Sequence, residues 1–292
     1  MRRTMLFLPG NNPNLIMNGG LLGSDTIILD LEDAVSPDDK DSARDLVRNA
    51  LKYMDFGGCE IIVRINALDT PYWEQDVEDI IPLKPDILMP TKVSGADYIR
   101  TLSAKMAEVE EKNGIPVGTV GLIPLLETAA GIENAYEIAK ADPRMRALYL
   151  GAEDLTADLR CKRTKEGGEI LYARGRLVCA ARAAGIEAYD TPFTDVDDIE
   201  GLRKDAMFAK SLGYTGKAVI SPRHVETVNE VFSPTAAEIR HAKQVLEAIE
   251  TARRMGKGAI SLNGKMIDAP IVLRAKLVME AAEAIGWEDE DE

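Results

Sequence analysis

The stretch Thr26-Ile27-Ile28-Leu29-Asp30-Leu31-Glu32-Asp33 decides the fold. Its first six residues are nearly all apolar and do not alternate with polar ones, which is typical of a parallel strand covered on both faces. Ser36-Pro37 follows, an N-cap residue before a proline at the first helical position. Apolar residues then recur at helical spacing over 43–54. The repeating unit is therefore a strand, a polar turn and a helix.

Seven further apolar runs are each followed by a segment with helical features. The eight predicted strands are 4–8, 26–31, 60–65, 86–89, 120–126, 147–150, 187–189 and 217–220. Eight strand–helix units fit a closed (β/α)8 barrel of about 250 residues. An open doubly wound sheet is the alternative, but no G-x-G-x-x-G motif follows the first strand. We therefore predict an α/β fold, a (β/α)8 TIM barrel with a C-terminal helical arm.

The predicted barrel takes up residues 1–232 and leaves 233–292 as an extension. This extension is predicted to be helical over 235–255 and again near 270–285, with a turn at Gly256-Lys257-Gly258. A barrel does not need it for closure, so we expect an arm that packs on the barrel or on a neighbouring protomer. The acidic residues 288–292 are expected to form a solvated tail.

Composition narrows the class of protein. Thirty-five Lys and Arg against 49 Asp and Glu give a net charge of −14, which disfavours binding to nucleic acid or to anionic membranes. Cys59, Cys161 and Cys179 are too far apart for a zinc knuckle, and an odd number does not suit a disulfide framework. The N-terminal residues lack an apolar stretch typical of a signal peptide or membrane span. We expect a cytoplasmic protein.

Charged side chains stand where several predicted strands end, the position of functional groups in a barrel. Glu32 and Asp33 follow the second run, Glu127 the fifth and Asp154 the sixth, while Arg64 lies near the end of the third. An unpaired carboxylate there is costly. Magnesium takes one or two carboxylates together with waters and substrate oxygens, so Glu127 and Asp154 are the predicted metal ligands.

Each of these acids, taken singly, is equally compatible with an ion pair or with capping of the next helix. The pair on neighbouring strands favours a metal site more strongly than either acid does alone. Zinc is disfavoured because the only histidines, His224 and His241, are not near a cysteine pair.

Arg64 is the predicted anchor for a substrate carboxylate, because its planar fork binds a carboxylate through two parallel bonds. The alternative is a structural ion pair with Glu32 or Asp33. Glu32 is a further candidate catalytic residue that orients waters, or else an N-terminal acid of the following helix. Lys92 offers a different mechanism, because a lysine at the end of a barrel strand can form a Schiff base. Nothing in the sequence indicates a neutral lysine, so metal chemistry is favoured.

Two glycine-containing segments carry basic residues. Arg160, Lys162, Arg163 and Lys165 precede Gly167-Gly168, and we assign Arg163 and Lys165 to a phosphorylated carrier or cofactor. The alternative is a solvated loop. Gly213-Tyr214-Thr215-Gly216-Lys217 lacks the full phosphate-loop spacing and precedes a strand, so we predict a turn there.

Five motifs in order along the chain resemble those of the citrate lyase beta-subunit family, within the HpcH/HpaI aldolase/citrate lyase group. They are Arg3-Thr4-Met5-Leu6-Phe7-Leu8-Pro9-Gly10, Leu29-Asp30-Leu31-Glu32-Asp33-Ala34-Val35, Val63-Arg64-Ile65-Asn66, Leu126-Glu127-Thr128-Ala129 and Gly151-Ala152-Glu153-Asp154-Leu155. The segments 168–174 and 261–268 favour the citrate lyase subunit itself. Met89-Pro90-Thr91-Lys92 departs from the family's more usual Leu-Pro-Lys order.

This resemblance implies a magnesium-dependent barrel enzyme that cleaves a citryl thioester to oxaloacetate and an acetyl thioester. Glu127 and Asp154 match the magnesium ligands, and Arg64 with Glu127 matches the residues that hold the oxaloacetate part. Asp268 matches an acid that reaches the neighbouring protomer's site, where we expect it to protonate the leaving enolate. The implied carrier is of the CoA type. Implied partners are an acyl carrier subunit, an acyl-transferase subunit and further copies of this chain, in a trimer.

Two rivals remain at this point. A free-standing malyl-, citramalyl- or hydroxymethylglutaryl-CoA lyase, or a malate-synthase-like enzyme, would use the same barrel, and malyl-type relatives share Met266-Ile267-Asp268. A non-catalytic subunit of a lyase complex is the rival from another class. The complete set of Arg64, Glu127 and Asp154 argues against that second rival, because a subunit without catalysis does not need a metal site.

Overall fold

The computed structural model describes residues 1–254, 260–262 and 265–287, and every predicted apolar run forms a strand there. All neighbouring strands of the large sheet are parallel. The second strand is buried at all five positions, as its continuous apolar sequence requires. The strands are β1 (Thr4–Pro9), β2 (Thr26–Asp30), β3 (Glu60–Arg64), β4 (Ile87–Met89), β5 (Gly121–Leu122), β6 (Leu125–Leu126), β7 (Ala147–Leu150), β8 (Glu187–Asp190) and β9 (Gly216–Val219).

The predicted fifth strand is divided into two, so the sheet has nine strands in the order β5-β4-β3-β2-β1-β9-β8-β7-β6. Pro124 lies between β5 and β6 and has no N–H to donate. The run still bonds on both sides: Leu125 N donates to Pro90 O after β4, and Tyr149 N of β7 donates to Pro124 O. The two ends of the strand order are thus pieces of one run, and the sheet is curled.

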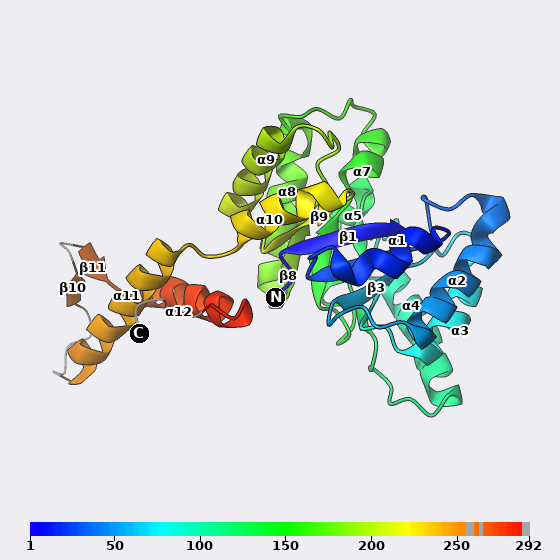
Figure 1. Ribbon diagram of the computed structural model, residues 1–292, viewed down its shortest axis with the longest axis horizontal. Helices are drawn as coiled ribbons and strands as arrows, with labels where there is room; N and C mark the ends of the chain where they lie inside the picture. Colours follow the sequence, from blue (N-terminus) through cyan, green and yellow to red (C-terminus); the bar gives the residue numbers. More distant parts are fainter. Residues whose placement is uncertain (255–259, 263–264, 288–292) are drawn as a thin grey trace. The chain divides into compact units, whose positions relative to one another are not determined.

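Helices follow the strands and cover the outside of this sheet (Figure 1). They are α1 (Pro13–Asn18), α2 (Lys40–Tyr53), α3 (Trp73–Ile80), α4 (Ala96–Lys112), α5 (Ala129–Glu133), α6 (Ala135–Ala139), α7 (Ala152–Asp158), α8 (Leu171–Ala184), α9 (Ile199–Leu212) and α10 (Val225–Phe232). Short 3-10 turns Pro37–Asp39 and Pro222–His224 stand at the two predicted Ser-Pro helix starts. Side chains from all eight runs meet in one core cluster: Met5, Ile28, Ile62, Ile87, Met89, Ile123, Leu125, Ala147, Tyr149, Tyr189 and Ala218.

The chain divides into two compact units, Arg2–Asn229 and Glu230–Glu292 with Met1. The second unit contains α11 (Ala236–Arg254) and α12 (Ala269–Ala284), close to the two predicted helices. It also contains an antiparallel pair that the sequence did not predict, β10 (Ile260–Leu262) with β11 (Lys265–Ile267). The predicted turn at Gly256-Lys257-Gly258 and the acidic tail lie outside the described residues.

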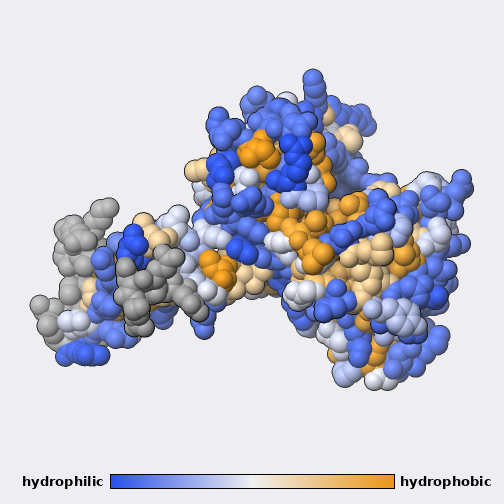
Figure 2. Space-filling view, viewed as in Figure 1, coloured by the Kyte–Doolittle hydropathy of each residue, from blue (hydrophilic) through white to orange (hydrophobic). Residues whose placement is uncertain are grey.

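Most of the surface visible in Figure 2 is hydrophilic, and apolar side chains gather on this face around β1 and α1. Among the helices described here, none combines the length and the apolar character needed to cross a bilayer.

A buried cluster of four charges fixes β8 and β9 to the helices outside them. The Lys217 Nζ donates to Asp190 Oδ2 at 2.6 Å and to Asp205 Oδ2 at 2.6 Å. Arg174 bonds the same two carboxylates at 2.7–2.9 Å. Two positive and two negative side chains therefore balance one another. The predicted turn into a strand is Gly213-Tyr214-Thr215-Gly216-Lys217. The side chain of its lysine belongs to this cluster.

Replacement of Lys217 by Met tests the importance of this balance. The variant leaves two buried carboxylates with one arginine, so we expect the free energy of unfolding to fall by about 3–5 kcal/mol. Arg100→Met is the control, because Arg100 pairs with Asp97 on the exposed face of α4 and should change it by less than about 1 kcal/mol. Urea unfolding at pH 7 measures both, and equal stability of the two variants would contradict the account.

Candidate functional site

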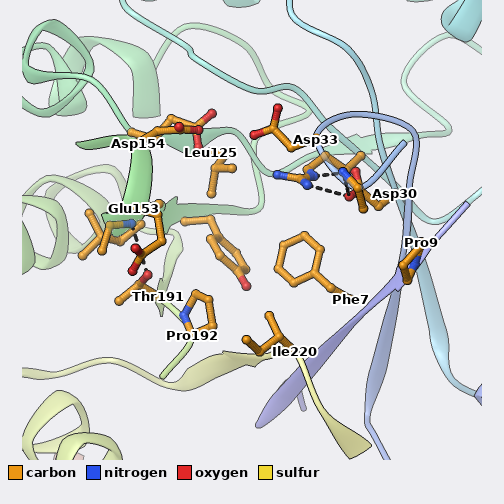
Figure 3. A pocket seen from close by; sticks show the side chains of 17 residues that line it. Phe7, Pro9, Asp30, Asp33, Leu125, Glu153, Asp154, Thr191, Pro192 and Ile220 are labelled. Atoms are coloured by element: carbon orange, nitrogen blue, oxygen red, sulfur yellow. Dashed lines mark hydrogen bonds and ion pairs between the residues drawn. The ribbon is translucent and has the colours of Figure 1, made fainter. Parts of the chain in front are cut away.

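A cavity of about 340 Å³ opens where the strands end, and it contains the predicted metal ligands and Arg64. Figure 3 shows Asp154 and Asp33 toward one edge of it, Pro192 and Ile220 toward the opposite edge, and the Phe7 ring between them. Its lining comes from several strand ends: Phe7, Pro9, Asp30, Asp33, Ala34, Arg64, Leu125, Glu127, Tyr149, Leu150, Gly151, Ala152, Glu153, Asp154, Thr191, Pro192 and Ile220. Their positions after predicted strands indicated that Arg64, Glu127 and Asp154 would lie together, and all three line this cavity. Asp268 belongs to the other unit.

Arg64 forms an ion pair, which was the alternative to binding a substrate carboxylate. Its main partner is Asp30, not Glu32 or Asp33 as expected. Its Nε and Nη2 donate to the two oxygens of Asp30 at 2.6 and 2.5 Å, and its Nη1 lies 3.1 Å from Glu32 Oε2. Burial lowers the pKa of Arg64, but the charge and hydrogen bonds of Asp30 outweigh this and hold the pKa above its ordinary value. Asp30 and Arg64 lie opposite each other in the β2–β3 register. This proximity becomes visible only once the pairing of the two strands is known.

Glu32 links two cations at the edge of the cavity. Besides Arg64, its carboxylate accepts from Lys92 Nζ at 2.6 Å and from the backbone N–H of Asp33 at 2.9 Å. The carboxylate is buried and its oxygens are occupied by these three groups. Glu32 is therefore placed to orient Arg64 and Lys92, and its role in orienting waters stays a prediction.

Lys92 does not suit Schiff-base chemistry. Burial lowers its pKa, but the hydrogen bond to Glu32 and the charges of Glu32 and Asp33 raise it further, so the pKa lies above its ordinary value. A protonated amine is not a nucleophile. Its backbone has a left-handed φ of 53°, and its N–H donates to Glu127 Oε1 at 2.8 Å. Lys92 thereby positions Glu127 through its backbone.

Glu127 and Asp154 line the cavity without an ion pair to any residue that the structure describes. Glu127 is 2% exposed, and among the described residues only the Lys92 N–H donates to it. Asp154 makes no hydrogen bond or ion pair within the described part of the chain. Burial, and then the charge of Asp154, raises the pKa of Glu127 well above the ordinary value. Gly151 leaves room for the pair, since a Cβ there would meet the Glu127 Cβ and Oε2 at 2.7 Å.

This donor set fits magnesium. Two carboxylates with space for waters and substrate oxygens are its usual protein ligands, whereas zinc sites use histidine and cysteine. Within the described residues, no group of three or more acids, histidines or cysteines forms a ready-made cage. The site therefore suits an ion that completes its coordination with water and substrate.

The two residues predicted to bind a cofactor are both engaged by carboxylates. Arg163 Nη1 donates to Glu169 Oε1 at 2.6 Å, and its Nε lies 3.3 Å from Glu153 Oε1. Lys165 pairs with Asp195 at 2.5 Å and Asp198 at 2.9 Å, and these hydrogen bonds raise its pKa to about 12. A phosphate would have to displace these partners.

Asp268 is the N-cap of α12, where its side chain accepts from the backbone N–H of Ile271 at 3.2 Å. It is exposed, so its carboxylate is accessible to other molecules. Its role toward a neighbouring protomer's site stays a prediction.

Asp30, Phe7 and Tyr149 line the cavity but were not chosen from the sequence. Asp30 stands beside two further acids, Glu32 and Asp33, and spacing alone does not single it out. Phe7 and Tyr149 lie within two of the predicted strands; Tyr149 belongs to the core cluster, and Phe7 packs against it.

Glu127→Gln tests the charge on this site in metal-free protein. Since the pKa of Glu127 is raised by folding, ionisation destabilises the folded state as pH rises above the ordinary glutamate pKa of about 4.3. We expect the variant to melt about 2–4 °C above wild type at pH 8, with the gain vanishing near pH 4. Thermal unfolding in EDTA measures it, with the exposed Glu137→Gln as control. A pH dependence unchanged by Glu127→Gln would contradict the assignment.

Comparison with known proteins agrees with this geometry. The family model for HpcH/HpaI aldolase/citrate lyase matches residues 3–222. The citrate lyase subunit beta of Leuconostoc mesenteroides subsp. cremoris is 46% identical, with 97% of this chain and 94% of the relative covered. The L-malyl-CoA/beta-methylmalyl-CoA lyase of Cereibacter sphaeroides is 36% identical, covering 97% and 95%.

A solved structure of the citrate lyase beta subunit from Mycobacterium tuberculosis, complexed with oxaloacetate and magnesium, is similar with a TM-score of 0.68. It is 29% identical, and the match covers 80% of this chain and 97% of that one. The family match spans most of the chain, and the relatives match nearly all of its length. The chain therefore belongs to the HpcH/HpaI aldolase/citrate lyase family.

Proposed function

We propose that this protein is a magnesium-dependent carbon–carbon lyase, the beta subunit of a citrate lyase, which cleaves a citryl thioester to oxaloacetate and an acetyl thioester. The observation that carries this proposal is the pair Glu127 and Asp154, left without a cation beside Arg64 in one cavity. The identity of 46% to a citrate lyase subunit beta favours the citryl substrate.

We also propose that the curled sheet is a closed (β/α)8 barrel with residues 233–292 as a C-terminal arm. Hydrogen bonds from the run 121–126 to β4 on one side and β7 on the other support closure. The second unit has a core cluster of its own, which includes Ala242, Val245, Ile267 and Ala275. This cluster supports an arm that is stabilised by contacts between its own elements.

Magnesium held by Glu127 and Asp154 would polarise the substrate hydroxyl and its neighbouring carboxylate as a Lewis acid. Arg64 contributes a fixed positive charge beside the same cavity, oriented by Asp30 and Glu32. Such preorganised charge holds a substrate carboxylate and keeps the breaking bond aligned.

Cleavage is the reverse of an aldol-type addition. The tertiary hydroxyl gives its proton to a base, the C–O bond becomes the carbonyl of oxaloacetate, and the electron pair of the breaking C–C bond passes to the thioester as an enolate. An acid then protonates the enolate carbon to give the acetyl thioester. We propose Asp268 of a neighbouring protomer as that acid, which its exposed position at the start of α12 allows.

Partners and carrier follow from the same assignment. We propose an acyl carrier subunit, an acyl-transferase subunit and a homotrimer, acting in the cytoplasm. The carrier is a CoA-type thioester whose phosphates would meet Arg163 and Lys165, in exchange for the carboxylates that hold these side chains now.

The second candidate is a free-standing malyl- or citramalyl-CoA lyase. The 36% identity to an L-malyl-CoA/beta-methylmalyl-CoA lyase favours it, and the metal site would serve both reactions. A non-catalytic subunit is disfavoured by the unpaired carboxylates, which are costly without a cation.

The isolated protein is expected to release oxaloacetate from citryl-CoA when magnesium is present. Glu127→Gln should reduce this rate by about 10²–10³-fold, because it removes one of the two carboxylates that would hold the magnesium acting on the reacting oxygen. The control variant Glu137→Gln, at an exposed position, should keep the wild-type rate. Release of glyoxylate from malyl-CoA or pyruvate from citramalyl-CoA, without cleavage of citryl-CoA, would contradict the citryl substrate and support the second candidate function.

The arm has its own test within this assay. Arg64→Ala and Asp268→Ala should each be inactive alone, and mixed oligomers should regain part of the activity if Asp268 acts across protomers. No recovery in verified mixed oligomers would contradict a shared site.

A further inference from the structure

The start of α7 decides where the Asp154 carboxylate lies, because Asp154 stands in the first turn of this helix. A serine, threonine or aspartate commonly precedes such a turn, and its side chain accepts from one of the first N–H groups. Here the N-cap residue is Gly151, which has no side chain to do so. A larger residue does not fit without a shift, because a Cβ at Gly151 would lie 2.7 Å from the Glu127 Cβ and Oε2. The close approach of Glu127 therefore leaves α7 without a cap of its own.

Thr191, which directly follows β8, supplies the acceptor from another strand. Its Oγ1 accepts from the backbone N–H of Ala152, the first residue of α7, at 3.1 Å (Figure 3). Thr191 is fully buried, and Ala152 is buried as well. Loss of this hydroxyl would leave a buried N–H without its partner, which is unfavourable. The first turn of α7 is thus tied to the end of β8 by one side-chain hydrogen bond.

The buried cluster of four charges holds Thr191 in turn. The Lys217 Nζ, which belongs to that cluster, also donates to the backbone oxygen of Thr191 at 2.7 Å. Thr191 is therefore fixed through its main chain and fixes α7 through its side chain. Two hydrogen bonds, from Lys217 to Thr191 and from Ala152 to Thr191, connect the rigid charge cluster to the helix that carries Asp154.

We propose that Thr191 is a positioning residue for the magnesium site: its hydroxyl fixes the first turn of α7 and so holds the Asp154 carboxylate beside Glu127. Asp154 has no ion pair or hydrogen bond to orient it among the residues that the structure describes, so the place of its carboxylate depends on the backbone of α7. This inference rests on the proposed function and adds to its metal site a residue that touches neither the ion nor the substrate.

Thr191→Val tests the inference, because it removes the hydroxyl and keeps the shape of the side chain, and Thr191→Ser should restore what it loses. Thr4→Val is the matched control. Thr4 is also a fully buried threonine, and its Oγ1 accepts from the Asp25 N–H at 3.2 Å, but it lies at the start of β1, whereas the end of β1 lines the cavity. The measurements are the magnesium affinity of the metal-free protein by calorimetry, its melting temperature, and the hydrogen exchange of the α7 amides without metal.

We expect Thr191→Val to bind magnesium about tenfold more weakly, since hydrogen bonds that orient metal ligands from outside have effects of this size. Its α7 amides should exchange faster than those of wild type even in the absence of metal. Thr191→Ser should bind magnesium as wild type does, and Thr4→Val should keep the wild-type affinity even where its melting temperature falls.

Equal magnesium affinity in Thr191→Val and wild type would overturn the inference and leave the proposed function intact. Equally weak binding in Thr191→Ser and Thr191→Val would also overturn it, because the hydroxyl would then not be the group that matters. A wild-type protein that does not bind magnesium would overturn the proposed function itself, and this inference with it.

Discussion

Buried charge must be balanced by charge, and this constraint organises the structure. Behind β8 and β9, two cations and two carboxylates are balanced within Arg174, Asp190, Asp205 and Lys217. At the strand ends, Arg64 and Lys92 are offset in the same way by Asp30 and Glu32. Glu127 and Asp154 are left over beside them. When both are ionised, Glu127 and Asp154 contribute two negative charges, and one magnesium ion neutralises two.

Much of the fold was predictable, because parallel strands buried on both faces leave continuous apolar runs in the sequence. All eight runs are strands, and the two Ser-Pro signals stand before α2 and α10. The division of the fifth run depends on the hydrogen bonds around Pro124. The β10–β11 pair was missed because each strand has three residues, too few to show a period.

The site was predictable only as far as strand ends reveal it. Position along the chain was enough to bring Arg64, Glu127 and Asp154 to one cavity. It could not choose among Asp30, Glu32 and Asp33 as the partner of Arg64, because that depends on strand register. The carboxylates around Arg163 and Lys165 come largely from other segments, so the sequence showed a basic loop where the structure has ion pairs.

The central claim is that Glu127 and Asp154 together hold a divalent cation, and titration of magnesium into the metal-free protein by calorimetry tests it most directly. Wild type should bind one ion per chain, and Asp154→Asn should weaken that binding by about tenfold or more, since removal of one of two charged ligands halves the charge that attracts the ion. Equal magnesium affinity in Asp154→Asn and wild type would contradict the account.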